Sequence, residues 1–466
     1  MKMKGKGGFF VNYDEIVSNT THSEKIGRLR RDTLSILEHA VKSVDPYKLV
    51  TTNVKLEDGI LKVLDAKKKK GVEIKLDKKG KKRAVAFGKA SLAMASAFAT
   101  IVDIDEGVVV IPHGQRGKRP SGMDIIEAEH PVPAQGSLIA ADRVLEMAER
   151  SMENDLFFAL ISGGGSSLLA KPVDGITLEE KIEVTNQLLK SGCTINEMNT
   201  VRKHISAIKG GKLAEAASPA TTIGLILSDV LGDSIDFIAS GPTARDTTTF
   251  KQAQGVLEKY GLWTKIPESM RGIIEGGIEK ERETKKPPFV AHNFIIGSNY
   301  IAAQAAIEKA KTLGYNSLLL TTHLEGESKE VAKVFTALMK DIRSHDTPLS
   351  TPAAVIAGGE TTVTVTGNGL GGRNQEFVLS AAINIPHGDD GIVIASMGTD
   401  GIDGMSDAAG AIADGFTLKR ASKAALNPDT YLRNNNSNTF FVKLNDALIT
   451  GRTGTNVNDV VVMLVE

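Results

Sequence analysis

The stretch LFFALISGGGSSLLA, residues 156–170, decides the fold of this chain. It opens with a continuous apolar run, Leu156–Ile161, which is typical of a short strand buried on both faces of a sheet. Ser162 and three glycines follow, and the apolar start of a helix comes next. A strand that enters a helix through a glycine turn is the repeating unit of helix-covered parallel sheets, so the stretch predicts an α/β fold.

The same alternation continues on both sides of this stretch. Further apolar runs that predict strands lie at Ala84–Phe87, Val108–Ile111 and Thr222–Leu227. Between them, apolar residues recur at helical spacing over Leu138–Met147 and Leu178–Leu189. Strands that alternate with helices favour a mainly parallel sheet with helices on both faces.

The length indicates more than one domain. A chain of 466 residues exceeds what one hydrophobic core usually serves, so we expect two α/β domains with a cleft between them. The best linker is Glu275–Pro288, which combines a charge cluster, a glycine pair and two prolines. We therefore predict domains at 1–285 and 286–466, with the helix that begins after Ser23 free to pack on the second. Strands of the second domain are expected near Phe289–Ile296, Ser317–Thr321, Ala353–Ala357, Thr361–Thr366, Ile392–Ser396 and Val460–Leu464.

A β-hairpin is predicted between Lys55 and Arg83 from two segments of alternating apolar residues. Its tip carries a run of lysines, Lys67–Lys70. A solvated turn is the plainer interpretation of these lysines, and a phosphate-attracting rim is the alternative.

The composition excludes several classes of partner. Because 56 Lys and Arg balance 56 Asp and Glu, no overall field attracts nucleic acid or an anionic membrane, and a small-molecule partner is favoured. Cys193 is the only cysteine, which suits a reducing compartment and excludes an intrachain disulfide. The N-terminal apolar run is too short for a signal peptide, and no run approaches the ~18 apolar residues of a membrane span. We expect a soluble cytoplasmic protein.

The strongest candidate site is the glycine-rich turn after the strand Leu156–Ile161. Glycines let the backbone approach an anion closely, and the serines add hydroxyl donors. We interpret the turn as a cradle for a phosphate or carboxylate, with a simple tight turn as the alternative. Its residues are Ser162, Gly163, Gly164, Gly165, Ser166 and Ser167.

A second strand end carries Gly88 and Lys89, which open a helix in AVAFGKASLAMA. Cations are repelled at a helix N-terminus unless an anion lies between, so Lys89 is a candidate phosphate ligand. A lysine that only caps the helix is the alternative.

Further candidates follow the next strands. Arg202 and Lys209 lie in NTVRKHISAIKGGKLAE and are possible phosphate contacts, although a solvated basic face explains most of that charge. Asp229 comes directly after the strand Thr222–Leu227, where a carboxylate can hold Mg²⁺ or orient a substrate hydroxyl. A loop-capping aspartate is the alternative.

In the second domain, Glu360 follows a strand and Arg373 follows a glycine-rich segment that we expect to be flexible. A guanidinium there can grip a carboxylate or phosphate with two hydrogen bonds. The acidic turn from Asp400 to Asp407 is expected to organise its own backbone, with metal or nucleotide contact as the alternative.

Several common motifs are absent from the sequence. GxxxxGK[ST] of the P-loop, GxSxG of hydrolases and HExxH of zinc enzymes do not occur, and GGGSS does not meet the GxGxxG fingerprint of dinucleotide-binding folds. The P-loop, common Rossmann, α/β-hydrolase and zinc-hydrolase interpretations are therefore weakened.

Six ordered blocks resemble the class II glycerate kinase family. They are ISGGGSSL, VRKHISAIKGGKLA, SDVLGDSIDFIASGPT, GGETTVTVTGNGLGGRNQEF, MGTDGIDGMSDAAGA and TGTNVNDV, and the resemblance covers the chain from about Glu24 to Val460. It implies a larger N-terminal Rossmann-like α/β/α domain and a smaller C-terminal α/β domain of the MOFRL type. By position, Lys89 and Arg373 match the family's charged residues.

The resemblance also implies an activity. It suggests ATP- and Mg²⁺-dependent phosphorylation of D-glycerate to 2-phosphoglycerate in the cleft between the domains. Lys89 and Arg373 would then be catalytic, and the glycine-rich turn would bind substrate. From the residues themselves we add Asp229 as a catalytic candidate, which would hold Mg²⁺ or orient the hydroxyl, and Arg202, Lys209 and Glu360 as substrate or phosphate contacts. Alternatives are phosphorylation of the 3-hydroxyl, NAD(P)H-dependent reduction of hydroxypyruvate, and a non-catalytic sensor of sugar acids or nucleotides. The oligomeric state stays open, with a homodimer as one option.

Overall fold

The computed structural model describes residues 8–19, 23–76, 79–279 and 289–466. These residues form two compact units. One comprises Pro46–Gly297, and the other combines the chain up to Asp45 with Ser298–Glu466. No helix of the described residues is long and apolar enough to cross a membrane.

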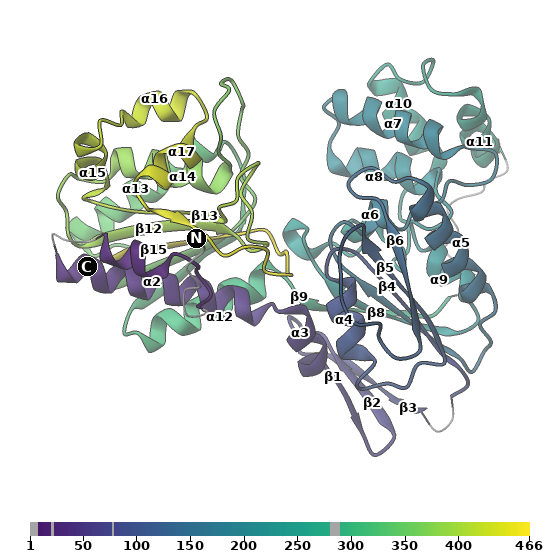
Figure 1. The fold of residues 1–466 in the computed structure, drawn as a ribbon. Coiled ribbons are helices and arrows are strands. Elements are labelled where there is room, and N and C mark those ends of the chain that lie inside the picture. The colour runs from purple at the N-terminus through teal and green to yellow at the C-terminus, as the bar shows by residue number, and fades with distance from the viewer. Residues whose placement is uncertain (1–7, 20–22, 77–78, 280–288) are drawn as a thin grey trace. The chain divides into compact units, whose positions relative to one another are not determined.

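The unit Pro46–Gly297 is built on a six-stranded sheet with the order β6-β5-β4-β7-β8-β9 (Figure 1). All of its neighbouring strands run parallel. Counted from β4, this order is 3-2-1-4-5-6, the doubly wound order of dinucleotide-binding folds, whose switch point lies between β4 and β7. The strands are β4 Lys82–Phe87, β5 Glu106–Pro112, β6 Met123–Ala128, β7 Leu156–Ile161, β8 Thr221–Leu227 and β9 Ala291–Gly297.

Helices cover both faces of this sheet because its strands are apolar on both sides. Phe157 faces the core cluster that includes α5, Gln135–Glu149. Its neighbour Phe158 points the other way, and its ring centroid lies 4.8 Å from that of Phe98 in α4, Ser91–Phe98. The predicted parallel sheet with helices on both faces is confirmed.

Four helices form a second core within the same unit, with apolar residues such as Val184, Val201 and Leu257 at its centre. Three of them begin with a capping box, in which a threonine and the Glu or Gln three residues later satisfy each other's backbone N–H groups. The helices are α7 Leu178–Lys190, α8 Ile195–His204, α10 Phe250–Lys259 and α11 Glu268–Glu279.

The predicted hairpin is present as β2, Ile60–Leu64, and β3, Gly71–Lys75, which pair antiparallel. Sequence analysis missed β1, Val54–Glu57, which extends it to three strands. Asp65 shapes the lysine turn by accepting hydrogen bonds from the backbone of Lys67 and Lys68. The exposed lysines at this tip agree with a solvated turn.

The other unit contains a mixed sheet with the order β10-β11-β15-β12-β13-β14. Only β10 and β11 run parallel, and the remaining neighbours are antiparallel. Helices α13 and α14 cover one face, and α2 and α12 cover the other (Figure 1). The strands are β10 Asn316–Leu324, β11 Ala353–Gly359, β12 Ile392–Gly398, β13 Gly410–Asp414, β14 Ala447–Leu448 and β15 Asp459–Val465, and the helices are α2 Glu24–Ser43, α12 Asn299–Thr312, α13 Ser328–His345 and α14 Arg373–Asn384.

Buried ion pairs fasten α2 to this sheet. The fully buried Arg30 pairs with Asp414 at 2.5 Å and with Asp446 at 2.7 Å. Removing either partner would leave a buried charge uncompensated, which is strongly destabilising. The first long helix therefore belongs to the unit that contains the C-terminal half, as the sequence allowed.

Shorter elements complete the two units. In Pro46–Gly297 they are α3 Pro46–Asn53, α6 Gly165–Leu168, α9 Lys212–Ala216 and the 3₁₀ turns η2 Leu231–Asp233 and η3 Ile238–Ser240. In the other unit they are α1 Tyr13–Ser18, α15 Thr417–Lys423, α16 Pro428–Arg433 and α17 Ser437–Lys443.

Two expectations about the boundary region need correction. β9 pairs with β8, so the segment expected to start the second domain completes the first sheet, and the units divide after Gly297 rather than at 285/286. The expected linker begins inside α11, and its residues 280–288 lie outside the described residues.

The segment Thr361–Thr366 is not a strand. It is held by other contacts instead, because Thr362 donates its backbone N–H to Gly326 and Thr364 donates its own to the Glu327 carboxylate. Its alternating threonines and valines fit β structure by pattern, but local side-chain contacts decide the conformation.

Candidate active site

The two strongest sequence candidates meet at the switch point of the parallel sheet. Lys89 follows β4 and the glycine-rich turn follows β7, and these strands are neighbours. The Lys89 backbone N–H donates to the Gly163 carbonyl at 2.8 Å, and Ala90 N–H donates to Ser162 Oγ at 3.1 Å. Ligands of doubly wound sheets bind at this point, outside the carboxyl ends of the strands.

Glycine is required at two positions of this junction. Gly88 has a φ of +118°, and a Cβ there would lie 2.2 Å from Ser162 Oγ. Gly164 has a φ of +81°, and a Cβ there would lie 2.9 Å from the His130 ring. The two turns therefore pack backbone against backbone, as only glycine permits.

The turn offers backbone donors to an anion. Gly165 and Ser167 donate their N–H groups within the turn. By contrast, no main-chain carbonyl among the described residues accepts from the N–H groups of Gly163 and Gly164. Consecutive backbone N–H groups in a turn that contains a left-handed residue, here Gly164, can form a concave site for an anion. Helix α6 begins directly after this turn.

Asp229 lies beside the same turn. A Cβ on Gly163 would come within 2.1 Å of Asp229 Oδ2, so the carboxylate lies directly against this glycine. Asp229 follows β8, the next strand of the sheet. Three adjacent strand ends thus bring a lysine, a glycine-rich turn and a carboxylate together.

Sequence analysis missed His130, which lies beside Gly164 and shortly after β6. The pKa of its imidazole is lowered by burial and by the charge of Lys89. The only available signal was its position after a strand, and that strand was itself missed, because MDIIEA is less apolar than its neighbours.

Behind the turn lies a second set of polar contacts. Ser166 Oγ lies 2.8 Å from Ser240 Oγ, and Lys209 Nζ donates to Ser166 O at 2.9 Å and to Ser166 Oγ at 3.0 Å. Lys209 is only 1% exposed, and burial holds the pKa of its ammonium well below the usual range. Lys209 therefore contacts the glycine-rich turn at Ser166, whereas Lys89 contacts it at Gly163.

Arg202 belongs to the same set of contacts. Its guanidinium donates to Asn199 Oδ1 at 3.4 Å, and burial lowers its pKa to about 10. Lys181 of α7, which sequence analysis did not single out, is buried nearby, and its pKa is lowered to about 7 by burial and by the charges of Arg202 and Lys212. It was missed because it stands in an amphipathic helix, where a lysine is normally solvated.

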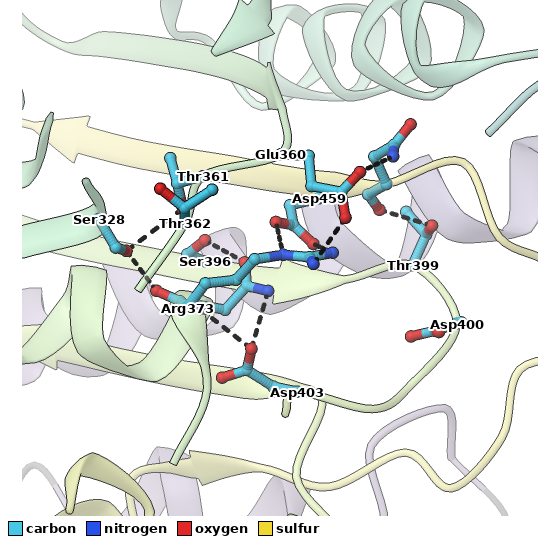
Figure 2. A network of polar contacts seen from close by, with 12 residues as sticks. Ser328, Glu360, Thr361, Thr362, Arg373, Ser396, Thr399, Asp400, Asp403 and Asp459 are labelled. Atoms are coloured by element: carbon cyan, nitrogen blue, oxygen red, sulfur yellow. Dashed lines mark hydrogen bonds and ion pairs between the residues drawn. The ribbon is translucent and has the colours of Figure 1, made fainter. Parts of the chain in front are cut away.

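Arg373, the main candidate of the other unit, is held by two carboxylates (Figure 2). Its Nε and Nη2 donate to both oxygens of Asp459 at 2.6 and 3.0 Å, and Nη1 donates to Glu360 Oε1 at 2.8 Å. Asn458 donates to the other oxygen of Glu360 at 2.8 Å. The Arg373 side chain remains 33% exposed, so part of the guanidinium still faces outward.

The glycine-rich segment before Arg373 is anchored rather than free, which differs from the expected flexible loop. Thr366 and Gly367 donate backbone N–H groups to Asn435 Oδ1 at 2.9 Å, and Leu370 donates to Asn436 Oδ1 at 3.0 Å. The segment positions the start of α14.

The acidic turn organises its own backbone, as expected. Asp400 accepts a hydrogen bond from Ile402 N–H, and Asp403 accepts from the first backbone N–H groups of α14, those of Asn374 and Gln375. Asp403 therefore caps a helix. Among the described residues, no group of three or more His, Cys, Asp or Glu could hold a metal ion.

This geometry defines a two-unit α/β protein with a glycine-rich turn, a lysine and a carboxylate at the switch point of a doubly wound sheet. Residues 32–275 match a family model described as a domain of unknown function, DUF4147, and residues 353–459 match the MOFRL family.

Known proteins share almost the whole chain. A glycerate 2-kinase of Pyrococcus horikoshii is 42% identical over 94% of this chain and 97% of its own length. A putative hydroxypyruvate reductase of Agrobacterium vitis is 43% identical, over 82% of this chain and 86% of its own. The crystal structure of a glycerate kinase from Thermotoga maritima matches with a TM-score of 0.84 and 39% identity, over 94% of this chain and all of that one. The chain belongs to the glycerate kinase family that joins DUF4147 and MOFRL domains.

Proposed function

We propose that this protein is a glycerate 2-kinase that transfers the γ-phosphoryl group of ATP to the 2-hydroxyl of D-glycerate. The observation that carries the proposal is the meeting of Lys89 and the glycine-rich turn at the switch point of the parallel sheet, in a chain 42% identical to a glycerate 2-kinase. Phosphoryl transfer depends mainly on positioning and on neutralising charge at the transferring group.

Lys89 and the turn supply those functions. The Lys89 side chain is exposed at the start of α4, where an ammonium can reach a phosphate. The N–H groups of Gly163 and Gly164 would donate to the phosphate oxygens, and Ser162 would hold the cradle together through Ala90. We assign Ser166 and Ser167 to positioning of the cradle, since Ser166 contacts Lys209 and Ser167 donates to Gly164.

Magnesium would enter with ATP and lower the charge on the phosphates. Mg²⁺ in such sites takes one or two protein carboxylates, with phosphate oxygens and water as its other ligands. Asp229 fits that role, because its carboxylate lies against the cradle at Gly163. If it does not hold the metal, the same position suits a carboxylate that orients the attacking hydroxyl.

Arg373 would contact the carboxylate of glycerate or a phosphate through its outward side. Three of its five N–H groups are taken by Asp459 and Glu360, which leaves two for a ligand. Glu360 would then act by orienting the guanidinium, and Arg202 and Lys209 would bind an oxyanion behind the cradle.

The product identifies the reaction. Phosphorus NMR of a mixture of D-glycerate, MgATP and enzyme should show 2-phosphoglycerate with stoichiometric ADP. L-Glycerate in a parallel sample tests the enantiomer, and a 3-phosphoglycerate signal would reassign the hydroxyl.

A hydroxypyruvate reductase is the second candidate, because a relative 43% identical carries that name. The predicted result is no loss of NADH or NADPH absorbance with hydroxypyruvate, since neither turn at the switch point of the parallel sheet, after β4 or after β7, carries the GxGxxG pattern that binds the pyrophosphate of dinucleotides. Ligand binding without ADP release or NAD(P)H oxidation would instead indicate a sensor. A homodimer stays a prediction for size-exclusion chromatography with light scattering.

A further inference from the structure

Three cationic side chains lie together behind the glycine-rich turn. Lys181 comes from α7, Arg202 from α8 and Lys209 from the turn after α8. Lys181 is 4% exposed and Lys209 is 1% exposed, and Arg202 is half-buried. Lys181 Nζ and Ser206 Oγ both donate to the Lys171 carbonyl, at 3.4 and 3.2 Å, and Ser206 Oγ accepts from the Lys209 N–H at 3.4 Å, so Lys181 lies beside the segment that carries Lys209. The charge of Arg202 also lowers the pKa of both lysines.

None of the three forms an ion pair with a carboxylate in the part of the chain that the structure describes. Lys209 donates only to the main-chain and hydroxyl oxygens of Ser166, at 2.9 and 3.0 Å. Lys181 donates to the Lys171 carbonyl at 3.4 Å, and Arg202 donates to Asn199 at 3.4 Å. These contacts are neutral, and two of them are long, so most donors of Lys181 and Arg202 remain available.

Neighbouring lysines show how charge is otherwise compensated in this region. Lys203, which is equally buried, pairs with Asp236 at 3.3 Å and with Asp246 at 3.6 Å. Lys212 donates to the carbonyls of Lys203 and Ser206 at the end of α8, where the helix dipole favours a cation. The charges of Asp246 and Glu215 also raise the pKa of Lys212 against the effect of burial, whereas no carboxylate acts in this way on Lys181, Arg202 or Lys209 in the described part of the chain.

Burying like charges together is costly unless an opposite charge joins them. We propose that Lys181, Arg202 and Lys209 form an oxyanion subsite, which binds a carboxylate or phosphate group of a reactant on the far side of the glycine-rich turn from Lys89. The identity of that reactant rests on the proposed glycerate kinase activity. The existence of the subsite does not.

The surrounding contacts hold the subsite in place without sealing it from solvent. Asn199 accepts from Ser240 at 3.1 Å, and Ser240 contacts Ser166, which ties α8 and η3 to the turn. Ser240 has a φ of +63°, a left-handed conformation that costs energy for a non-glycine residue and is typical of functional sites. Ser166 and Arg202 keep partial exposure, so solvent reaches this set of contacts.

Sulfate is a suitable probe because it is a tetrahedral dianion that does not titrate near neutral pH. We would measure the rise in Tm caused by sulfate at constant ionic strength against chloride, and the sulfate Kd by isothermal titration calorimetry. The variants are Lys181→Met and Arg202→Gln. The control is Lys190→Met, which removes the same charge from an exposed position of the same helix and corrects for the general stabilising effect of sulfate.

Wild type and Lys190→Met should bind sulfate and gain the same Tm. Lys181→Met and Arg202→Gln should bind sulfate at least about tenfold more weakly and lose most of the gain, because each loses a charged hydrogen bond to the anion. The proposal is overturned if wild type binds no sulfate, or if both variants keep its Kd. If one variant does not fold, the other decides.

Two further titrations identify the reactant. D-Glycerate supplies a carboxylate, and the magnesium complex of a non-hydrolysable ATP analogue supplies phosphates. The ligand whose Kd rises at least about tenfold in Lys181→Met, and not in Lys190→Met, occupies the subsite. If wild type makes 2-phosphoglycerate but both variants keep wild-type KM values for both reactants, the reactant assignment fails while the proposed function stands. If wild type makes no product but sulfate binding is lost in the variants, the subsite stands and the function fails.

Discussion

Arg373 and Lys209 are both cations at the edge of an α/β sheet, yet their surroundings differ. Arg373 is partly exposed and is held by the carboxylates of Asp459 and Glu360. Lys209 is fully buried, and its partners are the neutral oxygens of Ser166. A cation that the protein itself neutralises contributes to stability, whereas an uncompensated one is held ready for an anion. The proposed oxyanion subsite therefore lies in the unit Pro46–Gly297.

The largest expected effect is on catalysis at Lys89. Lys89→Ala should lower kcat about 10³-fold, because the phosphates lose a directed charge at the cradle. The side chain is exposed, so Tm and circular dichroism should stay at their wild-type values. Steady-state kinetics with D-glycerate and MgATP, with Lys190→Ala as the control, measure the change. A kcat within threefold of wild type would remove Lys89 from the mechanism.

The next largest effect is expected for Arg373→Met, which removes the cation whose charge Asp459 and Glu360 neutralise. It leaves Asp459 buried without its cation and should destabilise the protein by about 2 kcal/mol, less than for a fully buried pair because Arg373 is partly exposed. Denaturant unfolding measures this loss. In a double-mutant cycle, Asp459→Asn should recover part of it. An unchanged unfolding midpoint in Arg373→Met would show that the ion pair contributes nothing.

Gly164→Ala tests the shape of the cradle. Its φ is +81°, and its Cβ would collide with His130, whereas Gly192 has a φ of +72° with open space around it. Gly192→Ala is therefore a matched control that carries the backbone strain of about 1 kcal/mol without the collision. Gly164→Ala should lose about tenfold more kcat/KM than Gly192→Ala, since misplacing the amides weakens charge stabilisation. Equal losses would show that the contact with His130 is unimportant.

The smallest expected effect is a pH dependence of sulfate binding. Burial and the charges of Arg202 and Lys212 lower the pKa of Lys181 to about 7, so Lys181 gains its proton as pH falls through about 7. Lys209, also buried among these cations, has a lowered pKa as well. Sulfate should therefore bind more tightly at pH 6 than at pH 8, with proton uptake, which calorimetry in two buffers of different ionisation enthalpy detects. Affinity independent of pH in wild type would contradict this assignment.

The same pKa has a consequence for the ligand-free protein. The unfolded chain keeps Lys181 protonated up to its ordinary pKa, so between about pH 7 and that value the unfolded state binds more protons. The contribution of Lys181 therefore makes the protein more stable as pH rises through this window. Lys181→Met should flatten that part of the stability profile.

Much of the cradle was predictable from the sequence because local pattern determines it. The apolar run before Ser162 and the one before Gly88 fix two strands, and parallel strands bring the turns at their ends to one edge of the sheet. Asp229 follows by the same argument. Gly88 and Gly164 are glycines because a side chain at either position would collide with its neighbours. A glycine in a turn after a strand therefore indicates close packing, and this made the two turns the best candidates.

The remainder depends on contacts between residues far apart in the chain. Lys181 sits in an amphipathic helix, and nothing in that pattern shows that helices α7 and α8 bury it beside Arg202. Arg373 on α14 pairs with Asp459 on β15, which is far away in the sequence. Because this partner could not be foreseen, the sequence suggested that the whole Arg373 guanidinium was available to a ligand. The predicted domain boundary was misplaced because β9 pairs with β8, although a long, mostly helical segment separates the two strands in the chain. The glycines, prolines and charges of the sequence marked only the loop that precedes β9.

Thermal unfolding of Lys181→Met and Arg373→Met, side by side in a chloride buffer free of sulfate, phosphate and carboxylates, tests the comparison of compensated and uncompensated cations most directly. Lys181→Met removes an uncompensated buried charge, so its Tm should equal or exceed that of wild type. Arg373→Met removes the partner of a buried carboxylate, so its Tm should fall by several degrees. A fall in both variants would contradict the account, because Lys181 would then be a structural residue whose charge the protein already compensates.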